Sequence, residues 1–341
     1  MKKSKTGKIV IAGTVCVALL LGAACWGLLG NFSSSTTHTY IYIDQDDNAD
    51  SVFQKTRSYG RPLQFWTARA SAALLHYARN VRPGRYEVAP GKSTLQLVRD
   101  LRNGRQAPVR LTIPNVRTMN DLAARLGRQL EADSAEWAAS FADSAFCSQF
   151  GCDTATLACL FLPNTYEVFW NVTPAQLTRR MERESKAFWT QERLQAAEAA
   201  GLTPFEVITL ASIVDQETAN NEEKPLIAGM YLNRLREGMK LQADPTVKFA
   251  LHRFDLRRIL HEHLTVDSPY NTYRYEGLPP GPIAIPALSS IDAVLHYAHH
   301  DYLYMCAKED FSGTHRFAAT YEEHMRNARR YAEALNRRGI R

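Results

Sequence analysis

Residues 209–250, TLASIVDQETANNEEKPLIAGMYLNRLREGMKLQADPTVKFA, contain the helix that decides the fold of this chain, together with one acid in an unusual place. Successive residues of a helix are rotated by about 100°. With Ile213 as the origin, Leu210 falls at about 60° and Glu217 at about 40°, so Glu217 shares the apolar face. Asp215, at about 200°, faces the opposite side.

The position of Glu217 has a chemical consequence. Burial disfavours the charged form of a carboxyl group and raises its pKa. The helix is expected to end just after Glu217, where the negative end of the helix dipole acts in the same direction. A carboxyl group that stays protonated near neutral pH is suited to general acid catalysis. The alternative is a structural acid held by an arginine, a lysine or backbone amides.

Local signals place the neighbouring elements. Thr203 begins the helix of Glu217 with T-P-F-E, a capping box with Pro204 at the first helical position. Asn221 is the expected N-cap of the next helix, which runs through MYLNRLRE and stops at Gly238. Residues 268–286, SPYNTYRYEGLPPGPIAIP, are rich in proline, glycine and tyrosine and predict an extended wall with fixed turns.

The N-terminus carries a predicted membrane anchor. Residues 9–30 contain no charged side chain and are long enough to cross about 30 Å of hydrocarbon. Four lysines within residues 1–8 place the N-terminus in the cytoplasm and the remaining chain outside it. We therefore expect an uncleaved single span. A cleaved signal peptide is the alternative, although its apolar run is usually about 7–15 residues. LGAAC, ending at Cys25, only loosely resembles a lipoprotein cleavage site.

The net charge limits the classes of binding partner, and the cysteine content limits the possible disulfides. The net charge is +6, and the four N-terminal lysines supply four of these charges, which leaves +2 for residues 31–341. This balance does not indicate a nucleic-acid partner. The basic stretch at residues 326–341 is interpreted as a solvated helix face, with contact to anionic lipid or cell-wall polymer as the alternative. Four cysteines lie outside the anchor, where disulfides are possible in any of three full pairings: Cys147, Cys152, Cys159 and Cys306.

No metal or cofactor is predicted. The cysteine spacing lacks the paired ligands of a zinc site. His261 and His263, two apart on a probable helix, would point in different directions.

The chain is predicted to be α+β, with a tail (1–8), an anchor (9–30), a linker and small α+β module (31–113), and a mixed α/β domain (114–341) whose core spans about 201–330. In the module, residues 39–43 predict a strand, and Ser93 and Gly104 are expected to bound a helix. Residues 114–200 are predicted to be mostly helical, except for the cysteine segment and an ordered loop over residues 160–174.

Three motifs, in order, carry a resemblance to a known family: ASIVDQET (211–218), YLNRLREGMKLQADPTV (231–247) and YNTYRYEGLPPGPIAIP (270–286). With the anchor, they resemble the YceG-like endolytic murein transglycosylases. The match runs through most of residues 81–330 and is dense over 203–290. It implies that Glu217 is the catalytic glutamate and that the N-terminal module is a LysM-like glycan-binding unit.

The same resemblance suggests a set of substrate-binding residues. Amides could bind acetamido and hydroxyl groups, and the tyrosines could stack on sugars or pack under the proline-rich wall. Asp244 could either contact sugar or hold the turn at Pro245. The candidates are Asn233, Gln242, Asp244, Thr246, Tyr270, Asn271 and Tyr273.

The chain departs from the family pattern in places. Where the family has E-G-x-L-F-P-D-T-Y, residues 158–166 read ACLFLPNTY, so Ala158 stands in place of the acid and Asn164 in place of an aspartate. Ile285 occupies a position that is often asparagine. A mechanism that relies on the first acid is therefore not supported here. The LysM-like region also contains an insertion, residues 58–80.

The resemblance implies a membrane-anchored lyase with peptidoglycan as substrate. A hydrolase of glycosides normally needs two carboxylates, whereas a lytic transglycosylase can work with one. It cleaves the bond between N-acetylmuramic acid (MurNAc) and N-acetylglucosamine (GlcNAc) and closes a 1,6-anhydro ring. The expected role is to terminate elongation of nascent strands beside membrane-bound synthases, on the outer side of the cell (inner) membrane. The alternatives are a non-catalytic glycan-binding scaffold and a muramidase that uses Glu217 and Asp244.

Overall fold

The computed structural model describes residues 3–256 and 258–338. The chain forms two compact units of mixed helix and strand. The N-terminal unit comprises Met1–Leu111 with two short later segments, Gln129–Glu131 and Glu167–Val172. The C-terminal unit comprises Thr112–Arg128, Ala132–Tyr166 and Thr173–Arg341. Each unit is described by itself.

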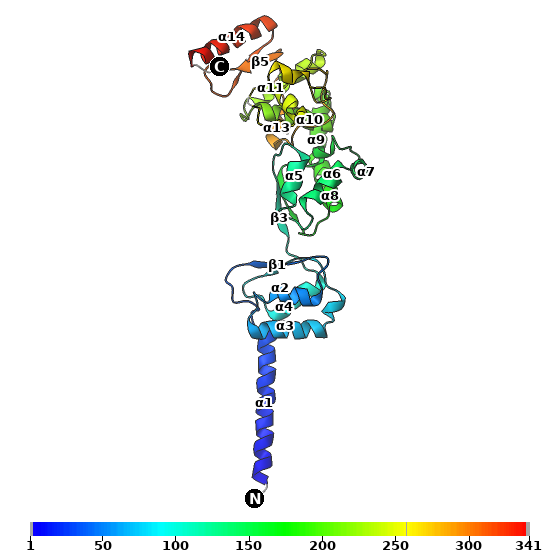
Figure 1. Ribbon diagram of the computed structural model, residues 1–341, viewed down its shortest axis with the longest axis vertical. Helices are drawn as coiled ribbons and strands as arrows, with labels where there is room; N and C mark the ends of the chain where they lie inside the picture. Colours follow the sequence, from blue (N-terminus) through cyan, green and yellow to red (C-terminus); the bar gives the residue numbers. More distant parts are fainter. Residues whose placement is uncertain (1–2, 257, 339–341) are drawn as a thin grey trace. The chain divides into compact units, whose positions relative to one another are not determined.

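The N-terminal unit begins with α1 (Lys3–Leu29), a long uninterrupted helix (Figure 1). Its segment Lys8–Leu29 is long and apolar enough to cross a membrane. The C-terminal end of α1 contacts α3, where the Thr67 hydroxyl donates a hydrogen bond of 2.9 Å to the carbonyl of Gly27. A helix thus occupies the segment in which the sequence predicts an anchor.

The remaining N-terminal elements enclose a separate core. They are β1 (Thr39–Ile43), α2 (Ala49–Thr56), α3 (Pro62–Leu74), the 3-10 turn η1 (Tyr77–Arg79), β2 (Gly84–Val88) and α4 (Thr94–Asn103). Strands β1 and β2 pair antiparallel, with Ile41 opposite Tyr86. Ser93 caps α4 and Gly104 ends it in a left-handed conformation (φ 69°), so both predicted boundaries are confirmed.

The middle of the chain is mostly helical, as predicted. It contains β3 (Val109–Ile113), α5 (Met119–Leu126), α6 (Ser134–Ala142), α7 (Ser144–Ser148), η2 (Leu157–Leu160), β4 (Asn164–Val168), α8 (Pro174–Phe188) and α9 (Gln191–Ala200). Strand β4 pairs with β3. The expectation of a loop throughout residues 160–174 was therefore wrong, because β4 forms a strand that pairs with β3, about 50 residues earlier in the sequence.

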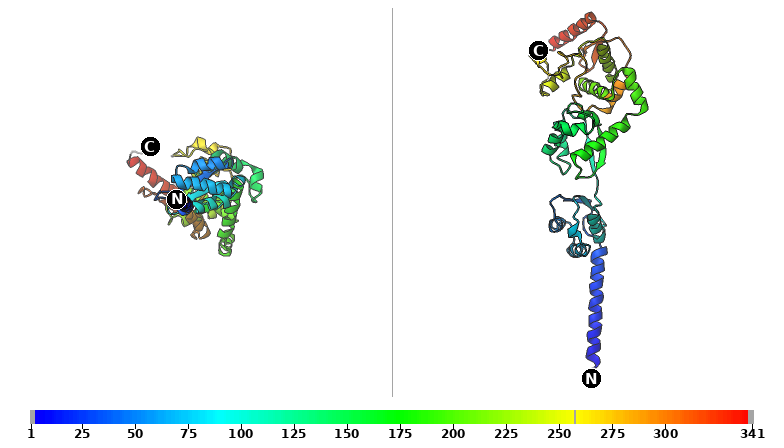
Figure 2. Two further views of the ribbon diagram at one scale, coloured as in Figure 1. Left: turned by 90° about the horizontal axis from the view of Figure 1, so that it is seen from below. Right: turned by 90° about the vertical axis from the view of Figure 1, so that its right-hand side faces the viewer.

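The last part of the chain surrounds a buried helix. Its elements are α10 (Pro204–Glu217), α11 (Lys224–Arg236), α12 (Asp244–Ala250), η3 (His261–Thr265), α13 (Leu288–Leu295), β5 (Tyr304–Ala307), β6 (His315–Ala318) and α14 (Tyr321–Arg337). Helix α10 contacts α9, α11, α12 and α13, and its side chains from Val207 to Val214 are all buried. Helix α14 packs on the β5–β6 hairpin (Figure 2).

The start of α10 matches its sequence signal, whereas the start of α11 does not. Thr203 and Glu206 form the predicted capping box, with Pro204 in the first turn. Asn221 does not cap α11, which begins at Lys224. Its side chain instead accepts a hydrogen bond from Ser289.

Residues 268–286 contain no helix or strand and form the predicted wall against α10. The Ile283 amide donates to the Ser212 hydroxyl of α10 at 3.0 Å, and the Ile285 amide donates to the Val116 carbonyl at 2.8 Å. These bonds fix the wall beside the C-terminal end of α10, where Glu217 lies. The cysteines of the described residues are free thiols, and Cys147 and Cys159 are buried.

Candidate active site

A cavity of about 230 Å³ opens at the C-terminal end of α10. Its walls come from α10, α11, the start of α12, Tyr273 and the β5–β6 hairpin. The lining residues are Glu217, Met230, Tyr231, Arg234, Leu241, Gln242, Asp244, Tyr273, Met305, Cys306, Ala307 and His315.

Glu217 is the last residue of α10, and its carboxyl group has an unusual environment. Its Oε1 accepts a hydrogen bond of 2.7 Å from the Tyr231 hydroxyl. Burial raises the pKa of Glu217 to about 7, against the opposing effect of the Tyr231 hydrogen bond. The Asp244 charge raises this pKa further, whereas the charges of His315 and Lys248 lower it. The group can therefore both donate and accept a proton near neutral pH.

Asp215, two residues earlier on the same helix, shows the contrasting arrangement. Its Oδ1 lies 3.1 Å from Nζ of Lys224, and both side chains are about 5% exposed. Ser290 and Asn115 also donate hydrogen bonds to this carboxylate. Asp215 is therefore a structural acid compensated by Lys224, whereas the Glu217 carboxyl accepts a hydrogen bond from a neutral phenol.

Arg234 organises the wall opposite α10. Its buried guanidinium donates to the carbonyls of Leu303 (2.6 Å), Lys240 (3.0 Å) and Leu241 (2.9 Å). Burial lowers the pKa of Arg234. Because these carbonyls belong to separate segments, one side chain ties α11 to the segment before α12 and to Leu303, the residue that precedes β5.

Asp244 and Gln242 flank the opening of the cavity, and both are exposed. Asp244 Oδ1 accepts a hydrogen bond of 2.6 Å from the Tyr273 hydroxyl. Burial and this hydrogen bond raise the pKa of Tyr273 far above its usual range. Gln242 adopts a left-handed backbone conformation (φ 51°), and its backbone amide donates a hydrogen bond of 3.0 Å to the Thr272 carbonyl. A second carboxylate thus lines the same cavity as Glu217.

His315 completes the cavity from strand β6. Its backbone amide donates to Glu223 Oε1 at 2.6 Å, and its Nδ1 lies 2.9 Å from Glu223 Oε2. Glu223 is buried, so this contact fixes the ring.

The structure divides the eight residues that the sequence suggested. Glu217, Gln242, Asp244 and Tyr273 line one cavity. The other four lie elsewhere, and three of them hydrogen-bond within the protein. Asn233 donates to the carbonyls of His300 and Tyr302, Asn271 to those of Leu264 and Val266, and the Thr246 hydroxyl to that of Ala243. Tyr270 packs against Phe249, with ring centroids 4.7 Å apart.

Sequence reasoning did not select Tyr231, Arg234 or His315 for the site. Tyr231 and Arg234 lie within the second of the three motifs, but the direction of their side chains toward the cavity depends on how α11 packs. His315 lies 92 residues after its partner Glu223, and no local pattern signals that contact.

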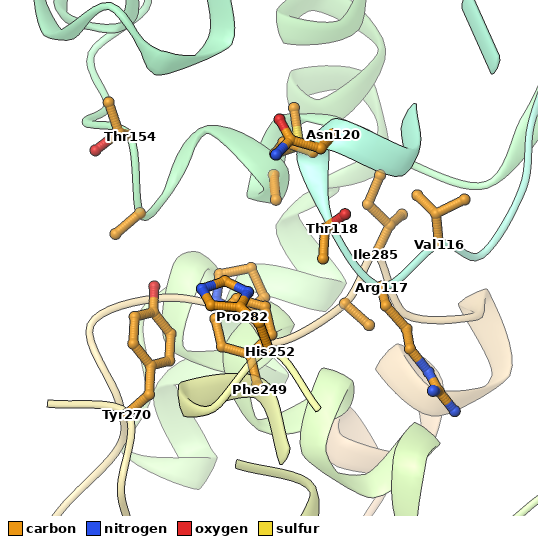
Figure 3. Close-up of a pocket in the computed structure, with 14 residues that line it drawn as sticks. Val116, Arg117, Thr118, Asn120, Thr154, Phe249, His252, Tyr270, Pro282 and Ile285 are labelled. Carbon is orange, nitrogen blue, oxygen red and sulfur yellow. The ribbon is translucent and has the colours of Figure 1, made fainter. Parts of the chain in front are cut away.

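A second cavity, of about 190 Å³, contains Tyr270 (Figure 3). Phe249, Pro282 and Ile285 give it an apolar lining, and Thr154 and Asn120 add polar groups. Ala158 also lines this cavity and does not line that of Glu217. The position where the family pattern has its acid is therefore separate from the Glu217 cavity.

These features define a class of site: a partly buried acid of raised pKa, which forms no ion pair within the described residues and lies beside a polar cavity, is typical of acid–base catalysis. The model of the YceG-like family matches residues 41–330. The chain belongs to the YceG-like family.

Relatives in this family carry a shared name. An endolytic murein transglycosylase of Bacillus subtilis (strain 168) is 40% identical over 130 residues, which are 38% of this chain and 35% of that protein. Another, of Streptococcus pneumoniae serotype 2, is 27% identical over 96% of this chain and 65% of its own length. The matches thus span less than two thirds of these curated relatives.

A solved structure supports the family fold. A yceG-like protein from Listeria monocytogenes has 25% sequence identity to this chain and a TM-score of 0.57. The similarity covers 86% of this chain and 99% of that one.

Proposed function

We propose that this protein is a membrane-anchored endolytic lytic transglycosylase, a lyase that cleaves the MurNAc–GlcNAc bond of peptidoglycan with formation of 1,6-anhydro-MurNAc. The observation that carries the proposal is the Glu217 carboxyl group, which burial brings to a pKa of about 7 at the edge of a polar cavity. The names of the relatives supply the substrate.

In the proposed reaction, one carboxyl group performs both proton transfers. Protonated Glu217 gives its proton to the glycosidic oxygen, and the bond from that oxygen to C1 of MurNAc breaks. The resulting carboxylate takes the proton of the MurNAc C6 hydroxyl, whose oxygen bonds to C1. The proton is returned to Glu217, and no water is consumed. Tyr231 holds Oε1 at 2.7 Å, which leaves Oε2 for the transfers.

The remaining candidates receive different roles in this proposal. Gln242, Asp244 and Tyr273 contact sugar, since they line the cavity. Asn233, Thr246 and Asn271 hold the surrounding loops through the contacts described above. Ala158 removes no group from the Glu217 cavity, so the reaction does not need an acid at that position.

The wider proposal concerns the whole chain. The anchor places a LysM-like glycan-binding module (within residues 31–113) and a catalytic domain (residues 114–341) outside the cell membrane. There the enzyme would terminate nascent strands close to membrane-bound synthases. The apolar length of α1 supports the anchor, and the match over residues 41–330 supports the family assignment of both parts.

Product analysis tests the reaction. The full chain in detergent should convert purified peptidoglycan into fragments with anhydro ends, and mass spectrometry should show them to be lighter by one water than hydrolysed fragments. Glu217→Gln should lower the rate by about 10²–10⁴-fold, the usual contribution of general acid–base catalysis. Full cleavage by Glu217→Gln would refute the assignment, and binding without cleavage by the wild type would indicate a scaffold.

A muramidase is the second candidate, because Asp244 lines the same cavity as Glu217 and could act as the second carboxylate. It predicts reducing MurNAc ends and incorporation of ¹⁸O from labelled water. Anhydro ends without label would exclude it.

A further inference from the structure

A third, smaller cavity of about 50 Å³ lies beside the two already described. Its lining residues are Arg117, Gln216, Pro245, Lys248, Phe254 and Ile283. Gln216 and Pro245 directly precede and follow two residues of the first cavity, Glu217 and Asp244. Arg117 is shared with the second cavity. The small cavity is thus the neighbour of the proposed reaction centre.

The lining of this cavity carries a positive charge. Arg117 and Lys248 are the charged side chains of its lining, and both are cations. Neither forms an ion pair with any residue in the described ranges 3–256 and 258–338. Tyr273 and Tyr231 hydrogen-bond to the adjacent acids Asp244 and Glu217.

Arg117 is held in place without an acid. Its guanidinium carbon lies 5.3 Å from the centroid of the Phe254 ring, a cation–π distance. In Figure 3 its side chain extends away from Tyr270, Thr154 and the centre of the second cavity. The guanidinium is therefore directed to the small cavity, and no residue within 3–256 or 258–338 accepts a hydrogen bond from it, so its donors can bind a ligand.

The size and charge of this cavity select a class of ligand. A space of about 50 Å³ admits a carboxylate group but not a sugar ring. Arginine and lysine bind carboxylates through charge-assisted hydrogen bonds, which are stronger than neutral ones. A glycan with muramic acid carries such groups on its lactyl substituent: a free lactyl carboxylate in denuded strands, or carboxylates of the peptide attached there.

We propose that Arg117 and Lys248 form a carboxylate subsite that binds the charged lactyl or lactyl-peptide substituent of the muramic acid residue at the cleaved bond. This proposal rests on the proposed function and deepens it. It explains why two cations that form no ion pair within the described part of the chain line one cavity beside Glu217. It also makes the enzyme select muramic-acid polymers over neutral chitin-like chains.

Binding measurements test the subsite without relying on cleavage. The full chain with Glu217→Gln in detergent is titrated calorimetrically with soluble strand fragments in three forms: peptide-bearing, denuded, and amidated with carbodiimide and ammonia so that the carboxylates become neutral. The carboxylated forms should bind about tenfold more tightly than the amidated form, as expected for hydrogen bonds to a charged group. Added Arg117→Gln and Lys248→Gln should abolish this difference. Arg128→Gln, an exposed arginine outside the three cavities, is the matched control and should retain it.

The comparison of fragments identifies the source of the carboxylate. Preference for denuded strands assigns the lactyl group, and preference for peptide-bearing strands assigns the peptide. Unchanged preference for carboxylated fragments in the Arg117/Lys248 double variant would overturn the subsite, as would equal binding of amidated fragments by the parent. Failure of the wild type to cleave any strand would instead refute the proposed function, while the titrations still report on the subsite.

Discussion

At the residue scale, α10 presents two acids in opposite electrostatic settings. Asp215 is paired with Lys224 at 3.1 Å, whereas Glu217 accepts a hydrogen bond of 2.7 Å from the Tyr231 hydroxyl. The same helix therefore carries one acid that is paired with a lysine and one acid that changes protonation near neutral pH. Ionising Glu217 in its buried setting costs free energy, and this cost is part of what makes it reactive.

We expect Glu217→Gln to stabilise the protein in a pH-dependent manner. The folded pKa of about 7 lies above the ordinary 4.5, so the folded state favours the protonated acid. The wild type thus loses stability as pH rises from about 4.5 through 7, by roughly 3 kcal/mol in total. Thermal unfolding of both proteins should give similar Tm values at pH 4.5 and a higher Tm for the variant at pH 8. A difference of the same size at both pH values would contradict the assigned burial.

Tyr231→Phe should move the pH profile of cleavage. The hydroxyl donates to the Glu217 carboxylate and lowers its pKa, so its removal raises that pKa. The first proton transfer requires the acid form, and the alkaline fall in kcat/KM should therefore move to higher pH. Tyr297→Phe, whose hydroxyl contacts Arg236 outside the cavity, should leave the profile unchanged. An alkaline shift in the control alone, or in neither variant, would rule out this role of Tyr231.

Residue-level prediction succeeded where a property is local. The helical period placed Glu217 among apolar residues, and its raised pKa follows from burial. The sequence was less informative for side-chain amides, because the amide of Asn271 can hydrogen-bond equally well to a sugar or to the backbone. In the folded protein, the Asn271 amide donates to the carbonyls of Leu264 and Val266, and its own burial is complete. That choice depends on a loop conformation that the sequence pattern does not encode.

At the element scale, the buried ion pair joins α10 to the start of α11. Lys224→Met would remove one partner and leave Asp215 charged and buried, which typically costs about 3–5 kcal/mol. We expect denaturant unfolding to show a loss of this order. Asp215→Asn combined with Lys224→Met should recover much of it, because the uncompensated charge is gone. A single variant as stable as the wild type would show that the pair is not needed to hold the two helices.

Element boundaries were predictable when both partners lie within a few residues. The capping box of Thr203 and Glu206 and the cap at Ser93 are examples, since their donors and acceptors are three residues apart. Strand β4 was missed because its hydrogen bonds go to β3, far earlier in the sequence. Asn221 had the composition of a cap but is engaged by Ser289 of α13. Contacts distant in sequence decided both cases.

At the scale of the whole molecule, α1 supports the proposed membrane anchor. A single apolar helix of this length would confine cleavage to glycan near the membrane surface. Its end also contacts the N-terminal unit through Thr67 and Gly27. Helix α1 therefore contacts a folded unit, which is consistent with the proposal that it is retained as an anchor.

Removal of residues 1–30 should abolish membrane association without changing the catalytic activity. The full chain should remain in the membrane pellet after an alkaline carbonate wash, because no charged side chain interrupts residues 9–30. The truncated chain should be soluble, and its kcat/KM on isolated strands should change by less than about threefold, since Glu217 and its cavity belong to the C-terminal unit.

Loss of the Thr67–Gly27 contact should lower the free energy of unfolding of the N-terminal unit by about 1 kcal/mol, the usual contribution of one hydrogen bond. Intact-mass measurement of protein from cells checks the premise, because a mature chain that lacks these residues would show that they are a processed signal.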